Sequence, residues 1–479
     1  MSKRTRIKSA DWIIAWDPAR QGHCYQTAAD LVFADDTIES IGVNDQSQTD
    51  ETIDGRGLLV MPGLVNSHSH PSTEPFFRGI REEQGVPQMY MTGLYERQLA
   101  YVPGMEYRRW AAEAAYCEML LSGVTTVADL SAPYDGWMDV AARSGLRVFL
   151  APNFASAGWH RDDDWRLQYN WDEPGGRKRF ETALDIIGKA QRHESGRLAG
   201  IVFPNQIDTC SAELLRDGFA AAVERKLPFT THCSQTVNEF NEMVNRNGKT
   251  PVQWAAEIGI LGPRTTLGHA IFIDEHSWLH WHTRDDLRLL SETRTAVAHC
   301  PSPFARYGQM LEHFGRYVKA GVTMTIGTDI SPHNLLEEMR LASTLARIAA
   351  QDVNSTSLSD VFAAATVGGA RSLQRDDLGY LAPGMKADLV LVEINNPYML
   401  PARDPLRSLV YTAADRAVRD VFVGGNQIVK DGAVLTLNHA DAVGRLVEAQ
   451  AKMEREAPTR DYRKRQSTQI APLSLPVVK

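Results

Sequence analysis

The sequence predicts an α/β protein: a (β/α)8 TIM-type barrel with a small β-sandwich domain formed by the N- and C-terminal segments. Three observations lead to this fold. Apolar runs typical of strands alternate with amphipathic helical stretches through most of the chain, which indicates a parallel sheet. Several of these runs end in His or Asp, at the position where a barrel presents catalytic side chains. Strand patterns without intervening helices occur at both ends of the chain.

The elements are expected in four consecutive segments. Residues 1–61 form the first part of the β-sandwich, 62–383 the barrel, 384–435 the second part of the sandwich, and 436–479 a C-terminal helix and tail. The expected barrel strands include residues 124–128, 147–151, 199–203, 229–232, 266–269, 295–299 and 322–328. After residue 384 two strand-like runs return, and the second leads into Gly424-Gly425-Asn426, which is a hairpin signal. Residues 440–457 show helical spacing of apolar positions.

Composition limits the class of protein. The chain has 479 residues, of which 43% are hydrophobic and 23% charged, as in a globular enzyme. The net charge is −8 and the basic residues are scattered, so a nucleic-acid partner is not expected. The five cysteines are widely spaced without a CxxC pair, which fits a reducing cytoplasm. We find no apolar run of about 18 residues and no signal peptide, so we expect no membrane association and a cytoplasmic enzyme.

The sharpest motif is PGLVNSHSH, which ends in His68 and His70. Residues two apart on a strand point to the same side, so both imidazoles are expected to face the barrel axis. An HxH pair also arises by chance, and a surface strand is the alternative interpretation. Histidine and aspartate residues at the ends of other expected strands favour a metal site, because clusters of imidazole and carboxylate groups suit zinc or iron.

Three other runs end in residues of the same kind. His232 ends residues 229–232, Asp329 ends residues 325–329, and His269 ends residues 266–269. Taken singly, each histidine is more often an ordinary buried polar residue. Together they predict a metal centre, with His269 placed to hydrogen-bond the attacking water rather than to ligate.

The sequence resembles the amidohydrolase superfamily, specifically its triazine hydrolase and cytosine deaminase-like branch. The resemblance covers nearly all of the sequence. The motifs that carry it are IDGRGLLVMPGLVNSHSH, SGVTTVAD, LPFTTHC, TLGHA, VAHCPSP, TIGTD, GARSLQRDDLGYLAPGMKADLVLVE and VFVGGNQIVKDG. The resemblance implies that the metal ligands are His68, His70, His232 and Asp329, with His269 as a catalytic neighbour and His299 as a substrate-pocket residue.

The chemistry of the expected ligands agrees with this assignment. A bound divalent metal lowers the pKa of water from about 16 to about 7, and Asp329 can serve both as ligand and as the base that takes the water proton. Relatives with two metals need a modified bridging lysine near the fourth strand, and residues 197–211 contain no lysine. We therefore expect one metal ion per chain, zinc first and iron, manganese or cobalt as alternatives.

Two departures from the family pattern concern the substrate. Deaminases of this branch carry a glutamate three residues after the fifth-strand histidine, where this chain has Gln235. Glutamine forms hydrogen bonds but cannot titrate. Adenosine-type deaminases also carry Pro-His in the fourth strand, where this chain has Pro204-Asn205. We expect Gln235 and Asn205 to contact the substrate, and a nucleoside substrate is in doubt.

Three functions remain open from the sequence. The leading hypothesis is hydrolysis of a non-peptide C–N bond in an amide, urea, carbamate or cyclic amidine of a small molecule. The alternative is deamination or dechlorination of an N-heterocycle of the triazine, purine or pyrimidine type. The third is a catalytically inactive barrel scaffold, against which the intact His and Asp set argues. We also expect a homo-oligomer.

Two aromatic segments are ambiguous. Residues 74–90 and the tryptophan-rich segment 159–171 line a substrate pocket, pack against the barrel or form a subunit contact. His276, His280 and His282 are expected on a surface helix rather than at a metal.

Overall fold

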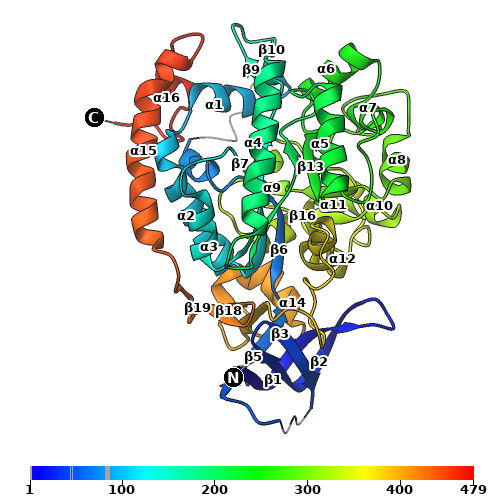
Figure 1. The fold of residues 1–479 in the computed structure, drawn as a ribbon, viewed down its shortest axis with the longest axis vertical. Helices are drawn as coiled ribbons and strands as arrows, with labels where there is room; N and C mark the ends of the chain where they lie inside the picture. The colour runs from blue at the N-terminus through cyan, green and yellow to red at the C-terminus, as the bar shows by residue number, and fades with distance from the viewer. Residues whose placement is uncertain (1–2, 44, 46, 81–86, 479) are drawn as a thin grey trace.

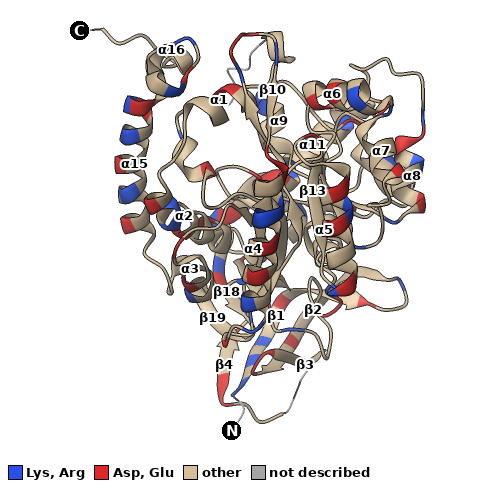
Figure 2. Cartoon of the chain, turned by 45° about the horizontal axis from the view of Figure 1, so that its top comes forward, with Lys and Arg blue, Asp and Glu red and all other residues tan. Residues whose placement is uncertain are grey.

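The computed structural model describes residues 3–43, 45, 47–80 and 87–478. A barrel with helices around it occupies most of the molecule, and a sheet built from both ends of the chain lies below it (Figure 1). No helix in the described part of the chain combines the length and apolar character that crossing a membrane requires. Lys, Arg, Asp and Glu are interspersed along the outer helices, so α15 shows both signs of charge (Figure 2).

The barrel consists of parallel strands that close on themselves. One parallel sheet has the order β11-β8-β7-β6 with β12 paired to β8, and a second has the order β13-β14-β15-β16. Bridges from Val202 to Phe229 and from Ser69 to Asp329 join the two sheets at both edges. The strands are β6 (Leu64–Ser69), β7 (Val124–Ser131), β8 (Arg147–Phe154), β11 (Leu198–Gly200), β12 (Phe203–Pro204), β13 (Phe229–Cys233), β14 (Thr265–His269), β15 (Ala296–His299) and β16 (Met324–Ile326). The expected barrel is confirmed, with the fourth strand divided into β11 and β12.

Amphipathic helices cover the outside of the barrel. They are α2 (Arg108–Leu121), α3 (Trp137–Ser144), α4 (Glu173–Gln191), α5 (Ala212–Glu224), α6 (Val237–Asn247), α7 (Pro251–Glu257), α8 (Asp286–Glu292), α10 (Phe314–Lys319), α11 (Leu335–Ala350) and α12 (Leu358–Ala363). Helix α5 shows why they form. The Ser211 side chain caps its N-terminus by accepting from the Leu214 N–H, and the buried residues Leu214, Leu215, Gly218, Ala221 and Ala222 share one face. This is the spacing that buries one stripe of a helix.

The ends of the chain form a nine-stranded sheet. Its order is β20-β19-β18-β17-β5-β1-β2-β3, with β4 paired to β1. Its strands are β1 (Arg4–Asp17), β2 (Gly22–Ala34), β3 (Thr37–Gly42), β4 (Glu51–Asp54), β5 (Leu58–Pro62), β17 (Leu389–Glu393), β18 (Val418–Val423), β19 (Asn426–Lys430) and β20 (Ala433–Val434). The sheet is continuous, yet its two halves face each other as in a sandwich, because Phe33 of β2 packs on Phe422 of β18 with ring centroids 5.8 Å apart.

A buried ion pair connects this sheet to the barrel. Arg147, the first residue of β8, donates from Nε and Nη2 to the two carboxylate oxygens of Asp388 at 2.8 and 2.9 Å. Both side chains are buried, and Asp388 also accepts from the Gly424 N–H. The contact therefore ties the barrel, the strand β17 and the β18–β19 turn together.

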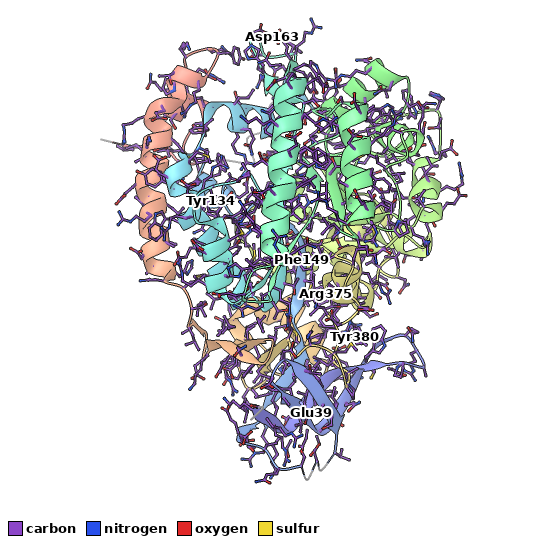
Figure 3. All side chains as sticks on the ribbon, viewed as in Figure 1. Glu39, Tyr134, Phe149, Asp163, Arg375 and Tyr380 are labelled. Atoms are coloured by element: carbon purple, nitrogen blue, oxygen red, sulfur yellow. The ribbon has the colours of Figure 1, made fainter. Side chains whose placement is uncertain are left out.

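The C-terminal helix α15 (His439–Arg460) packs on α2, as Figure 1 shows on one side of the barrel. Its buried residues Ala442, Leu446, Ala449, Met453 and Ala457 recur at helical spacing, so the helix expected over 440–457 is confirmed. A short hairpin, β9 (Ala157–His160) and β10 (Gln168–Trp171), projects at the opposite end of the molecule from the terminal sheet. Asp163 in its loop and Glu39 in β3 mark these two ends in Figure 3.

One local prediction was wrong. The segment with His276, His280 and His282 forms turns and not a helix. The carboxylate of Asp274 accepts from the backbone N–H of Asp285 and from the Thr283 hydroxyl. Such side-chain hydrogen bonds to the backbone compete with helical ones, and the pattern of apolar residues does not reveal them.

Candidate active site

The candidate site lies at the carboxyl ends of the barrel strands, in a cavity of about 340 Å3. This volume falls within the range of about 300–1,000 Å3 that small-molecule sites occupy. The residues that line it include His70, Glu74, Arg97, Arg108, Asn153, Trp159, Asn205, His232, Gln235, Phe304, Tyr307 and Asp329. Polar groups therefore converge on a pocket with aromatic walls.

Strand β6 brings the first two histidines to the site. His68 is fully enclosed, while His70 lies at the strand end and borders the cavity. The Nδ1 atom of His70 lies 2.8 Å from the Leu130 carbonyl oxygen. When Nδ1 donates its hydrogen to this carbonyl, the Nε2 atom carries the free lone pair, which faces the centre of the barrel.

His232 is held in the same way from the other side of the barrel. Its Nδ1 atom lies 2.6 Å from the Asn205 carbonyl oxygen, and its Nε2 atom lies 3.3 Å from Nε2 of His70. The two imidazoles thus present their Nε2 atoms to one point. This orientation by backbone carbonyls is typical of metal-ligating histidines.

Asp329 completes the cluster from the loop after β16. Its Oδ1 atom lies 3.6 Å from Nε2 of His68 and 3.3 Å from Nε2 of His70, and its Oδ2 atom lies 3.9 Å from Nε2 of His269. Burial opposes charge on this carboxyl, but the nearby imidazoles of His68 and His70 hold its pKa well below the usual value. The carboxylate is therefore ionised beside the histidines.

The donor set fits a divalent metal. Ligand atoms of His68, His70 and Asp329 lie within 4.8 Å of one another, as do those of His68, His232 and His269. Both ring nitrogens of His68 and of His269 are buried without a hydrogen-bond partner among the described residues. Burial also lowers the pKa of His232 and of His269, and the neutral imidazole is the form that binds metal.

The two expected substrate contacts border the cavity. Gln235 and Asn205 both line it, and the Oε1 atom of Gln235 is buried without a hydrogen-bond partner in the described structure. The turn that carries Gln235 is fixed by Glu239, whose carboxylate accepts from the N–H groups of Ser234 and Gln235. Burial raises the pKa of Glu239 to about 8, but its oxygens are engaged with the backbone rather than with the cavity.

His299 lies apart from the cavity. It ends β15 as expected, but it is not among the described residues that line the pocket. Its ring packs against Phe314 at 5.7 Å between centroids, and burial lowers its pKa to about 3. In this structure it belongs to the packing behind the site.

The tryptophan-rich segment only partly lines the cavity. Trp159 lines the cavity, and its Nε1 donates to Asp208 at 3.2 Å. Tyr169 donates to the same carboxylate oxygen at 2.7 Å, so Asp208 anchors the β9–β10 hairpin beside the pocket. Trp165 and Trp171 are exposed. Of the expected aromatic loop 74–90, Glu74 borders the cavity and residues 81–86 lie outside the described part.

Sequence reasoning missed two arginines of the cavity wall. Arg97 on α1 (Leu94–Ala100) donates to Glu74 at 2.7 Å, and Arg108 begins α2. Nothing in their local sequence marks them, because each arginine sits in a helical segment typical of a solvated surface. Only the folding of α1 and α2 toward the barrel mouth brings them to the pocket.

The closed barrel, with histidines and a carboxylate gathered where its strands end, defines this chain as a barrel enzyme with a candidate metal centre. The chain belongs to the amidohydrolase family, whose model matches residues 59–428. It is therefore a hydrolase that acts on carbon–nitrogen bonds other than peptide bonds.

Curated relatives cover nearly the whole chain. A 5-methylthioadenosine/S-adenosylhomocysteine deaminase of Natronomonas pharaonis is 29% identical over 88% of this chain and 93% of its own. A 5'-deoxyadenosine deaminase of Methanothermobacter thermautotrophicus is 30% identical over 84% of this chain and 90% of its own.

Solved structures share the fold. An adenosine deaminase of Xanthomonas campestris with bound zinc superposes with a TM-score of 0.79 at 21% identity, covering 94% of this chain and 98% of its own. The atrazine chlorohydrolase of Arthrobacter aurescens in complex with zinc also has a TM-score of 0.79, at 23% identity, covering 93% of this chain and all of its own.

Proposed function

We propose that this chain is a mononuclear metal hydrolase in which His68, His70, His232 and Asp329 hold one divalent ion, with zinc as the first candidate. The convergence of these side chains at 3.3–3.6 Å supports the assignment. Three imidazoles and one carboxylate are a ligand set suited to zinc, iron, manganese or cobalt. The intact set also argues against an inactive scaffold.

The metal would supply Lewis acidity and lower the pKa of water toward neutrality. Asp329 would accept the proton of the attacking water and pass it to the leaving nitrogen, because its ionised carboxylate is the base at the centre of the cluster. His269, whose Nε2 lies 3.9 Å from Asp329, would orient the water. Its fully buried ring and low pKa support a neutral, positioning role.

The properties of Gln235 favour one substrate class, amides, ureas, carbamates and cyclic amidines, over aminated heterocycles. The Oε1 atom of Gln235 is buried beside the cavity without a hydrogen-bond partner in the described part of the chain, and an amide can donate or accept but cannot titrate. The nearby carboxyl of Glu239 is occupied by backbone N–H groups. Hydrolysis of an amide, urea, carbamate or cyclic amidine has less need of a second acid at this place than ring deamination, so we rank it first.

The second candidate is deamination of an N-heterocycle. The curated relatives are named as deaminases of modified adenosines, and Trp159, Phe304 and Tyr307 line the pocket with aromatic rings. Stacking on such rings would suit a flat heterocycle. Dechlorination of a triazine-like ring belongs to the same candidate.

A substrate panel separates the two. Zinc-loaded enzyme would be assayed against amides, ureas, carbamates and aminated purines, pyrimidines and triazines, with ammonia and ring products measured separately. We expect turnover of an amide or urea substrate. Efficient ammonia release from an aminated heterocycle, with no amide or urea cleaved, would reverse the ranking.

We place the enzyme in a reducing cytoplasm and expect a homo-oligomer. All five cysteines are free, which supports the compartment. The tail after residue 471 exposes Leu473, Leu475, Val477 and Val478, and apolar side chains of this kind favour contact with a second copy. Sedimentation of the full chain beside a variant ending at residue 471 tests the contact.

A further inference from the structure

We propose that the active-site cavity binds a carboxylate group of the substrate through Arg108. The inference rests on the proposed function in one respect, namely that the molecule in this cavity is the substrate. It narrows the substrate class from amides and ureas in general to those that carry an acidic group, such as N-acylated or N-carbamoylated amino acids.

Arg108 is the first residue of α2, and its side chain forms part of the cavity wall. Its Nε and Nη1 atoms are buried and have no hydrogen-bond partner in the described structure. Burial lowers the pKa of Arg108. No carboxylate in the described part of the chain pairs with the Arg108 guanidinium, which therefore borders the cavity as a positive charge without a counter-ion among those residues.

The neighbouring charges are already paired. Arg97, in the same wall, forms an ion pair with Glu74 at 2.7 Å. Glu106, two residues before Arg108 in the chain, is paired with Lys452 at 2.8 Å, and Glu113, on the same helix, is paired with Arg143 at 2.9 Å. Among the described residues these carboxylates are engaged elsewhere, so a ligand anion is the partner that we infer for Arg108.

Tyr134 lies close enough to Arg108 for the two side chains to interact electrostatically. It lies in the segment between β7 and α3, and its hydroxyl is buried without a hydrogen-bond partner among the described residues. Figure 3 labels it in the part of the barrel beside α2. A neutral phenol cannot balance a guanidinium. Tyr134 therefore leaves the positive charge of Arg108 uncompensated.

The chemistry of the site favours a monoanion. A guanidinium matches the planar geometry of a carboxylate and can bind it through two parallel N–H donors. One uncompensated arginine therefore fits one carboxylate.

Matched pairs of ligands test the proposal directly. Zinc-loaded enzyme would be titrated by calorimetry with hippurate and hippuramide, N-carbamoylphenylalanine and its amide, and adenosine-5'-carboxylate and its carboxamide. We expect the carboxylate of at least one pair to bind about 10-fold more tightly or better, as a hydrogen bond to a charged group implies. Carboxylates that bind no more tightly than their amides in all three pairs would overturn the inference.

Variants test whether the preference for carboxylates over amides depends on Arg108. Arg108→Gln should remove it, Arg108→Lys should retain part of it, and Arg109→Gln should leave it unchanged. Arg109 is the matched control because it is exposed on the same helix, with its guanidinium 4.6 Å from the Trp110 ring. Circular dichroism and zinc content would establish that each variant is folded. A folded Arg108→Gln protein that keeps the full preference also overturns the inference.

The binding experiment is independent of turnover. Carboxylate preference lost in Arg108→Gln would support the subsite even if the substrate panel revealed ring deamination instead of amide hydrolysis. Conversely, cleavage of amides with equal binding of acids and carboxamides would support the proposed function and reject the subsite.

Discussion

The Nε2 atoms of His70 and His232 lie 3.3 Å apart, although 162 positions separate the two residues in the chain. Two nitrogens bound at about 2.1 Å to one tetrahedral zinc ion lie roughly 3.4 Å apart. Backbone carbonyls of Leu130 and Asn205 hold the opposite edges of the two rings. The fold itself therefore arranges two imidazoles at the separation that a single metal ion requires.

We predict close to one tightly bound divalent metal ion per chain. The variant His232→Ala should lose both this metal ion and the enzymatic activity. The variant removes an imidazole from the centre of the cluster and should lower the melting temperature, because bound metal stabilises the native state. Elemental analysis and thermal unfolding measure both effects. His282→Ala is the control, since His282 lies outside the cluster. Two metals per chain, or full activity of metal-free protein, would contradict the mononuclear assignment.

Asp329→Asn separates metal binding from proton transfer. The asparagine retains an oxygen ligand but cannot accept the water proton, so turnover should fall by ~10²-fold or more while metal is at least partly retained. The measurement is kcat at matched metal content. Undiminished kcat in the metal-loaded variant would remove Asp329 from the chemistry.

Gln235 is tested by a pair of variants on the substrate that the panel identifies. Gln235→Ala should lower kcat/KM by ~10-fold or more, because a hydrogen bond to the substrate is lost. Gln235→Glu should not increase turnover if the substrate is an amide or urea. A markedly faster Gln235→Glu enzyme would instead indicate that the reaction needs a titrating acid there, as ring deamination does.

Asp388→Ala should destabilise the protein by about 3–5 kcal/mol, because it leaves the buried Arg147 guanidinium unpaired. Denaturant unfolding followed by tryptophan fluorescence measures the change. Asp217→Ala is the matched control, since Asp217 pairs with Arg177 on the surface, where both side chains are more than one-third exposed. Exposed pairs contribute about 0–1 kcal/mol. Equal losses in the two variants would show that burial of the pair is not what matters.

The sequence by itself determined the barrel and the centre of the site. Alternating strand and helix patterns encode the parallel sheet, and His68 and His70 share a face because side chains alternate along a strand. His232, His269 and Asp329 were also found from sequence, because each ends an apolar run and barrel strands present their ends at one mouth. These features depend on local periodicity, which neighbouring residues in the chain are enough to define.

Only the tertiary structure decided what surrounds that centre. His299 ends a strand like the other histidines, yet it packs on Phe314 behind the cavity. Arg108 has the local sequence of a surface helix, yet α2 brings it to the cavity wall without a carboxylate partner among the described residues. Whether a charged side chain is paired depends on contacts between segments far apart in the chain, and local periodicity carries no information about those contacts. The same physical reason explains why the cluster of histidines and Asp329 could be predicted from sequence, whereas the shape and charge of the cavity around it could not.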